Sequence, residues 1–163
     1  MVSFMKIKSA SLALIAFLVI FVVLPAVFIQ INNRFSLPEF SHLFLKVIGI
    51  FLIFLGVLPG MYTFVIFRKV GKGTPIPVEP PKKLVIEGLH CYCRNPMYVG
   101  YMAILFGIAF LFGHVLLFGY AVLMMIFIHF TVVMIEEPIL RKRFGSEYDA
   151  YASQVPRWFR FKF

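Results

Sequence analysis

The residues with the most evident chemistry in this chain lie where long apolar stretches begin or end. Arg94-Asn95-Pro96-Met97-Tyr98 opens one such stretch, and a pair of carboxylates, Glu136 and Glu137, closes another. Ionisable side chains at the boundary of a hydrocarbon layer are costly to keep, so they indicate a functional site. Two adjacent carboxylates repel each other and call for cationic or hydroxyl partners. Arg94 and Arg157 are candidates for that role.

The first block fits the beginning of a helix. Pro96 suits the first helical position, where the missing N–H of proline costs nothing, and Asn95 then suits the N-cap. The free N–H groups of such a turn favour an anionic group, such as a carboxylate. A capped membrane helix with an interfacial arginine and tyrosine would give the same string, so the block alone leaves both interpretations open.

Other titratable and aromatic residues are open to two interpretations. Glu136 lies seven residues after His129. An unbroken helix would therefore put both on one face, with His129 buried about two turns deep. A histidine of this kind is more often structural than catalytic. Four tyrosines are expected near the membrane boundary, where they indicate either an aromatic belt or a cage for a cationic ligand such as a sulfonium. These tyrosines are Tyr92, Tyr98, Tyr148 and Tyr151.

The chain offers no pattern for a metal or dinucleotide site. Cys91 and Cys93 are separated by one residue, and the four histidines are scattered. A zinc site would need a second pair of ligands at suitable spacing. The glycines Gly71 and Gly73 lack the preceding strand and the third glycine of a dinucleotide fingerprint. We therefore expect no metal.

Composition and periodicity predict the elements that carry these residues. Apolar residues make up 61% of the 163-residue chain and charged residues 14%, against about half and a quarter in soluble domains. The sequence predicts an all-α polytopic protein that forms a single membrane domain, 1–163. Four apolar segments predict transmembrane helices at about 10–31, 43–67, 96–112 and 115–135. Only Gly113-His114 separates the last two, which predicts a tight helical hairpin.

The distribution of charge predicts the orientation. Most lysines and arginines flank the start of the chain or lie in the loop 68–95 and the tail 138–163. By the positive-inside rule, a multi-pass protein with both termini and this loop in the cytoplasm is expected. The tail is predicted to form an amphipathic helix at the membrane interface. The net charge of +9 is explained by this bias and by attraction to the lipid bilayer, and not by nucleic-acid binding.

Several motifs between residues 71 and 158 occur together in one order. They are Gly-x-Gly-Thr-Pro-x-Pro at 71–77, Leu84-Val85, the block from Arg94 to Gly100, Glu136-Glu137-Pro138, Phe144-Gly145, Tyr148-x-x-Tyr151 and Val155-Pro156-Arg157. In these motifs the chain resembles the isoprenylcysteine carboxyl methyltransferase and phospholipid N-methyltransferase family of integral membrane enzymes. The resemblance implies S-adenosylmethionine as cofactor and a lipid-borne or amphiphilic acceptor at the cytoplasmic interface. The alternatives are an NADPH-dependent sterol-type reductase and a non-enzymatic membrane scaffold.

The resemblance also implies roles for individual residues. The cofactor pocket would be lined by Leu84, Val85, His90, Asn95, Pro96, Met97, Tyr98, Glu136 and Tyr148. The catalytic machinery would include Arg94, Glu137 and Arg157. Asn95 stands where many members have histidine, His90 replaces an aromatic residue and Cys91 a frequent arginine. Val132 stands where eukaryotic prenylcysteine enzymes have an arginine, so the acceptor stays unassigned. The predicted hairpin should place the Asn95–Tyr98 turn and Glu136 on opposite walls of one pocket.

Overall fold

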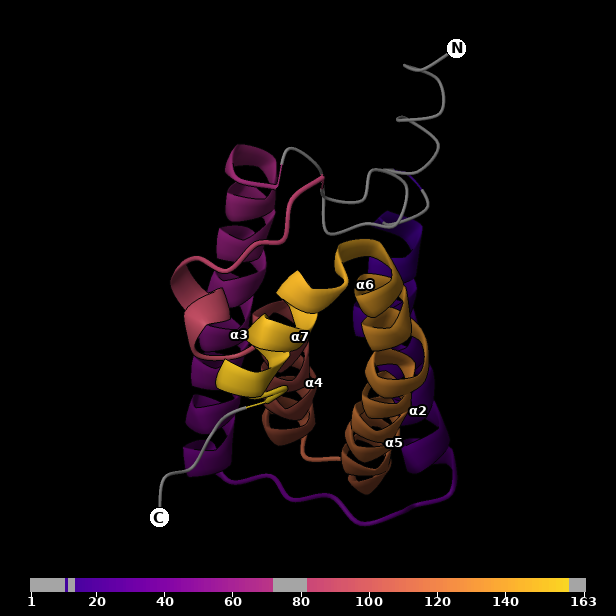
Figure 1. The fold of residues 1–163 in the computed structure, drawn as a ribbon. Coiled ribbons are helices and arrows are strands. Elements are labelled where there is room, and N and C mark those ends of the chain that lie inside the picture. The colour runs from indigo at the N-terminus through magenta and orange to yellow at the C-terminus, as the bar shows by residue number, and fades with distance from the viewer. Residues whose placement is uncertain (1–10, 12–13, 72–81, 159–163) are drawn as a thin grey trace.

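The computed structural model describes residue 11 and residues 14–71 and 82–158, and this part of the chain is all-α (Figure 1). Within it, Leu14–Arg34, Leu43–Phe67 and Val115–Phe144 are long and apolar enough to cross a membrane, and Pro96–Phe112 is a shorter apolar helix. The chain is therefore a multi-pass integral membrane protein. Most of the glycine- and proline-rich motif at 71–77 lies outside the described residues.

The helical elements follow the predicted apolar segments closely. In chain order they are η1 (Val19–Val23), α2 (Leu24–Arg34), α3 (Leu43–Lys69), η2 (Gly88–Cys91), α4 (Pro96–Phe112), α5 (Val115–Thr131), η3 (Val132–Glu136), α6 (Glu137–Phe144) and α7 (Ser146–Gln154). The bounds of α4 are those predicted, whereas α2 and α3 each run a few residues beyond their predicted ends. η1 and η3 have π-helical hydrogen bonding, and η2 is a single 3-10 turn.

The closest helix packing joins α3 to α4 through glycines. A Cβ atom at Gly56 would lie 2.5 Å from the carbonyl oxygen of Gly100, and one at Gly49 would lie 2.6 Å from that of Gly107. Only residues without a side chain allow two backbones to approach so closely. This contact sets the C-terminal part of α3 beside the first turn of α4, where the polar block begins.

The predicted tight hairpin between α4 and α5 is confirmed. Gly113 ends α4 with a φ of 73°, and its N–H donates to the carbonyl oxygen of Ala109. This left-handed conformation is typical of the glycine that ends a helix. The segment before α3 covers the turn, because the Phe40 N–H donates to the Gly113 oxygen at 2.9 Å and Glu39 pairs with His114 in an isolated β-bridge.

The last long helix extends further than predicted. The fourth apolar segment was expected to end near residue 135, but the helical chain continues through both glutamates to Phe144. At η3 the hydrogen bonding widens, so that the Glu137 N–H donates to the Val132 oxygen. Pro138, which has no N–H to donate, follows directly at the second position of α6. The glutamates therefore lie within the helix and not beyond its end.

The prediction of one interfacial helix after Pro138 is wrong. α6 ends at Phe144, and Gly145 has a φ of 52°, a backbone conformation that residues with a Cβ rarely adopt. α7 then runs in a new direction across the end of the bundle, in front of α4 in this view (Figure 1). The Tyr151 hydroxyl donates to the carbonyl oxygen of His90 at 2.7 Å, which fixes α7 against η2.

Candidate active site

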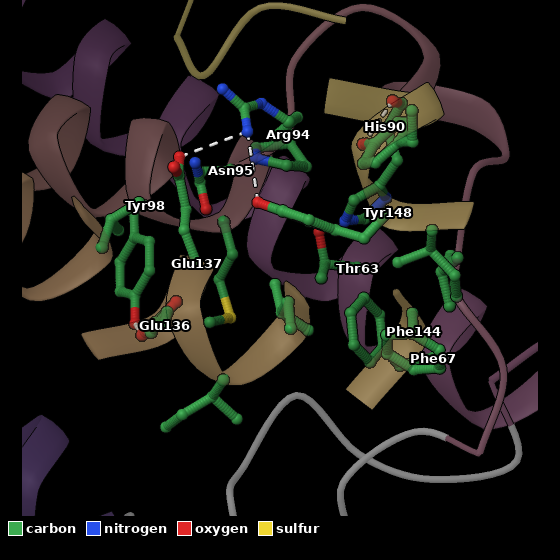
Figure 2. Close-up of a pocket in the computed structure, with 18 of the residues that line it drawn as sticks. Thr63, Phe67, His90, Arg94, Asn95, Tyr98, Glu136, Glu137, Phe144 and Tyr148 are labelled. Carbon is green, nitrogen blue, oxygen red and sulfur yellow. Dashed lines mark hydrogen bonds and ion pairs between the residues drawn. The ribbon is translucent and has the colours of Figure 1, made fainter. Parts of the chain in front are cut away.

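A cavity of about 400 Å³ gathers the polar residues at the end of the bundle that α7 covers (Figure 2). Its walls come from α3, the segment before α4, the first turn of α4, the η3–α6 region and α7. The predicted site residues that line it are Leu84, Val85, His90, Arg94, Asn95, Pro96, Met97, Tyr98, Glu136, Glu137 and Tyr148. The structure thus brings together in one cavity all of the predicted site residues except Arg157.

Arg157 contacts the site through Glu137. Its Nε lies 2.5 Å from Oε1 of Glu137, and its Nη2 lies 3.0 Å from Oε2. Arg94 approaches the same carboxylate, with Nη1 3.2 Å from Oε1. Glu137 is only 5% exposed, and a carboxylate so far from water is tolerated when it is paired and hydrogen-bonded. The cationic partners expected for the glutamates are therefore found on Glu137.

Arg94 also joins this ion-pair cluster to α7. Its Nη1 donates to the Tyr148 hydroxyl at 3.1 Å, which Figure 2 shows as a dashed line. Burial raises the pKa of Tyr148, so this residue remains a neutral phenol. The Nε of Arg94 is buried and has no hydrogen-bond partner within the described part of the chain. Arg94 thus retains one donor for a ligand.

Glu136 occupies another part of the cavity and has a different partner. The Tyr98 hydroxyl donates a hydrogen bond to Oε1 of Glu136. The two side chains were expected on opposite walls, but they meet at one end of the cavity (Figure 2). No described cationic residue forms an ion pair with Glu136. Its carboxylate can therefore accept a hydrogen bond from a ligand or attract a cationic one.

The tail after α7 is fastened to the start of α4. The Arg94 N–H donates to the Pro156 oxygen at 2.9 Å, and Asn95 Nδ2 donates to the Arg157 oxygen at 3.0 Å. Asn95 occupies the N-cap position as predicted, but its side chain makes no cap hydrogen bond. The amide is instead committed to the tail, because α7 brings residues 155–158 back to this point. These contacts position the Arg157 side chain at Glu137.

His90 forms part of the wall contributed by η2. It is 5% exposed, and its Nδ1 has no hydrogen-bond partner among the residues described. Its ring packs against Phe67 with 5.5 Å between the ring centroids. Burial lowers the pKa of His90 from 6.5 to about 4. The imidazole is therefore neutral at physiological pH and presents an uncharged polar group to the cavity.

The lowered pKa of His90 predicts a dependence of stability on pH. Between pH 4 and 6.5 the unfolded chain binds a proton at this histidine that the folded protein does not bind, so stability should rise with pH across this window. We expect His90 to account for about 2–3 kcal/mol of the change. Thermal unfolding of wild type and His90→Phe in detergent, from pH 4 to 7, measures it. An equally steep pH dependence in both proteins would contradict the assignment.

His129 lies outside the cavity, which corrects its predicted position. It is exposed, and its Nδ1 accepts a hydrogen bond from Trp158 Nε1 at 3.2 Å. The wide turn of η3 inserts an extra residue between His129 and Glu136, which rotates them relative to each other by about 100°. His129 instead borders a second, apolar hollow of about 440 Å³. The hollow is lined by Val99, Met102, Met125, Ile126, Ile128, His129, Phe130 and Trp158.

Several residues of the cavity were not predicted to be site residues. They are Thr63, Phe67, Val132, Ile139, Leu140, Arg143, Phe144 and Tyr151. Thr63 and Phe67 belong to α3, which carries no charged residue between Lys46 and Arg68, so the sequence does not indicate which of its faces lines a site. Phe144 and Tyr151 stand in the motifs noted above, which was the available signal for them. No cluster of histidine, cysteine or acidic residues suited to a metal ion occurs within the described ranges.

Comparison with known proteins assigns the family. The sequence model of the family described as phospholipid methyltransferase matches residues 44–147, which include α3 to α6 and most of the cavity. No curated protein and no solved structure matches the chain. The family match covers more than half of the chain and agrees with the motif resemblance. The chain therefore belongs to the phospholipid methyltransferase family of membrane enzymes, which use S-adenosylmethionine.

Proposed function

We propose that this protein transfers a methyl group from S-adenosylmethionine to a lipid-borne, amphiphilic acceptor at the cytoplasmic surface of a membrane. The observation that carries the proposal is the cavity. It combines the ion-pair cluster at Glu137 with buried polar atoms that have no partner in the described protein, at one end of a bundle of apolar helices. Family membership favours this function over the sterol-type reductase and the scaffold.

The residues of the cavity fit the methyl donor. The volume of the cavity, about 400 Å³, falls within the usual range of about 300–1,000 Å³ for small-molecule sites. Three buried atoms of cavity-lining residues have no described partner: Thr63 Oγ1, His90 Nδ1 and Arg94 Nε. Burying such groups costs free energy unless a ligand or water completes their hydrogen bonds. Glu136, which has no cationic partner among the described residues, suits a positively charged group.

The contribution of this chain to catalysis is positioning and exclusion of water. S-adenosylmethionine supplies a methyl group carried on a positively charged sulfur. Glu136 and Tyr98 would orient the ligand at one end of the cavity, and Arg94 would contact it from the other side. Leu84, Met97 and Leu140 line the remaining wall with apolar surface. Fixed polar groups in a site from which water is excluded accelerate a direct displacement without a covalent intermediate.

The second hollow supports an acceptor with a hydrocarbon chain. Its lining is apolar apart from His129 and Trp158, and these two satisfy each other through their hydrogen bond. The hollow and the cavity draw on neighbouring residues of the chain, since Val99 follows Tyr98 of the cavity and Trp158 follows Arg157, which pairs with Glu137. An apolar chain held there would keep the polar head of the acceptor near the ion-pair cluster. We propose this hollow as the place where the acceptor's chain lies.

The proposed topology has four membrane-spanning helices and the cavity facing the cytoplasm. α4 is short for a spanning helix, but its tight connection to α5 allows it to cross as one arm of a hairpin. Arg141, Lys142 and Arg143 on α6 lie at the end of the bundle that carries the cavity. An excess of basic residues at this end supports a cytoplasmic location for it, for both termini and for the loop 68–95. α7 would lie at the interface.

Replacing Glu136 with glutamine tests the proposed ligand contact. The change keeps the size of the side chain and removes its charge. Loss of a charge-assisted hydrogen bond is worth about 1.5–3 kcal/mol, so affinity for S-adenosylhomocysteine should fall roughly ten- to a hundredfold. Calorimetric titration of wild type and Glu136→Gln measures the difference. Glu147→Gln serves as the matched control, because it removes the charge of an exposed glutamate on α7 that does not line the cavity.

The function itself is tested by methyl transfer in a bilayer. The purified protein in lipid nanodiscs, given S-adenosylmethionine with an isotopic label on the methyl group, should transfer the label to a product that extracts into organic solvent. Glu136→Gln should lower the rate at subsaturating donor. If wild type binds no S-adenosylhomocysteine and labels no lipid or amphiphile, the proposed function is wrong.

A further inference from the structure

Thr63 is a buried hydroxyl without a described partner in a helix that carries no motif. It is 2% exposed, and its Oγ1 makes no hydrogen bond to any residue that the structure describes. A threonine in an apolar helix normally donates to the carbonyl oxygen four residues earlier. Thr131 does so here, with its Oγ1 2.9 Å from the oxygen of Phe127. Thr63 makes no such bond, although it also lies within a helix. Its side chain lines the cavity instead.

The cavity has one side that carries the carboxylates and another side that is mainly aromatic. In Figure 2, Glu136, Glu137 and Tyr98 lie on one side, whereas Thr63 and Phe67 lie on the other with Phe144, Tyr148 and His90. The second side is therefore rich in aromatic rings, and its cationic neighbour at Phe144 is Arg143, which lies over that ring 5.6 Å from the centroid. The neutral imidazole of His90 adds a further polar atom, Nδ1, without a described partner. A flat, uncharged ring system with hydrogen-bonding atoms fits this surface better than an ionised group does.

S-adenosylmethionine contains both kinds of group. Its amino-acid part is ionised and its sulfur is positively charged, whereas its nucleoside is neutral, flat and rich in hydrogen-bonding atoms. Bound with its charged part near the glutamates, it would place the nucleoside against the wall formed by α3 and η2. The chemistry of the two sides thus specifies one direction of binding.

We propose that the Thr63 hydroxyl binds the nucleoside of the methyl donor, on the wall that it forms with Phe67 and His90. This inference rests on the proposed function and assigns a binding role to a residue of α3, outside every motif of the chain. It has a consequence that a structural role for Thr63 would not have. Removing the hydroxyl should stabilise the ligand-free protein, because a buried group without a partner is lost, while the same change weakens binding.

The experiment compares Thr63→Val, Thr63→Ser and Thr131→Val. Affinities for S-adenosylhomocysteine and for 5′-methylthioadenosine, which has the nucleoside but no amino-acid part, are measured by calorimetry and by competition. Thr63→Val should weaken both ligands by the same factor, about three- to tenfold. It should also raise the unfolding temperature of the ligand-free protein by about 2–4 °C. Thr63→Ser should retain most of the affinity, and Thr131→Val should leave both affinities unchanged.

Each alternative result has a definite meaning. Equal affinities for wild type and Thr63→Val would overturn the inference while leaving the proposed function intact. A loss confined to S-adenosylhomocysteine would also overturn it, since Thr63 would then contact the amino-acid part. Failure of 5′-methylthioadenosine to compete at millimolar concentration would exclude a nucleoside site of this kind. Failure of wild type to bind S-adenosylhomocysteine would instead refute the proposed function. Lower stability of Thr63→Val without ligand would indicate a structural hydroxyl and contradict the inference.

Discussion

Replacing Glu137 with alanine is expected to lower the free energy of unfolding by about 3–5 kcal/mol. Glu137 is 5% exposed and is the shared partner of Arg94 and Arg157. Without its carboxylate, two guanidinium groups would face each other in a largely dehydrated site. The segment that carries Arg157 would also lose its main side-chain attachment, so ligand binding should fail together with stability.

Unfolding of the purified protein in mixed micelles, followed by circular dichroism, measures this effect. Glu147→Ala is the matched control, because Glu147 is an exposed glutamate on α7 and its removal should change stability by less than about 0.5 kcal/mol. Glu137→Gln should be intermediate, since an amide keeps one acceptor oxygen. If Glu137→Ala unfolds like wild type, the ion-pair cluster does not hold the tail in place. Glu136→Gln should leave stability nearly unchanged, which separates the roles of the two adjacent carboxylates.

Replacing Gly100 with alanine should destabilise the protein by about 1–3 kcal/mol or more. A Cβ atom there would lie 2.4 Å from the carbonyl oxygen of Gly56, and both partners are backbone that cannot rotate away. α3 and α4 would have to separate. Because Thr63 on α3 and the Arg94–Tyr98 block at the start of α4 line the same cavity, affinity for S-adenosylhomocysteine should fall as well.

Gly119→Ala provides the control for helix propensity. Gly119 lies within α5, and a Cβ atom added there would meet nothing within 4 Å. Alanine is favoured over glycine in a helix by about 0.8–1.0 kcal/mol, so this change should be neutral or stabilising. The unfolding temperatures of the two variants should therefore move in opposite directions. A similar small shift in both would mean that α3 and α4 do not pack through their glycines.

The bounds of the apolar helices could be predicted well because their signal is local. α4 begins at Pro96 and ends before Gly113, and both residues act through their own backbone preferences. The end of the last long helix could not be predicted in the same way. Pro138 normally indicates an interruption, but the wide turn at η3 precedes it and the helix continues to Phe144. That turn depends on how the whole segment packs, which no local residue pattern reports.

The polar part of the site was also visible in the sequence. The Arg94–Tyr98 block, the adjacent glutamates and Tyr148 stand out because such residues are rare beside apolar helices. The pairing of these groups was not visible. The adjacent pair of glutamates did not indicate that Glu137 binds two arginines whereas Glu136 binds a tyrosine. The two sets of partners differ because of the rotation of the helix at η3.

The sequence by itself determined that this protein is a helical membrane protein, where its apolar helices lie and which polar residues cluster at their ends. These properties follow from composition, from the length of apolar runs and from single-residue effects. Only the tertiary structure decided that α7 returns across the bundle, that Arg157 reaches Glu137 and that Thr63 lines the cavity. Such features depend on contacts between segments far apart in the chain, where helix rotation and close glycine packing determine which side chains meet.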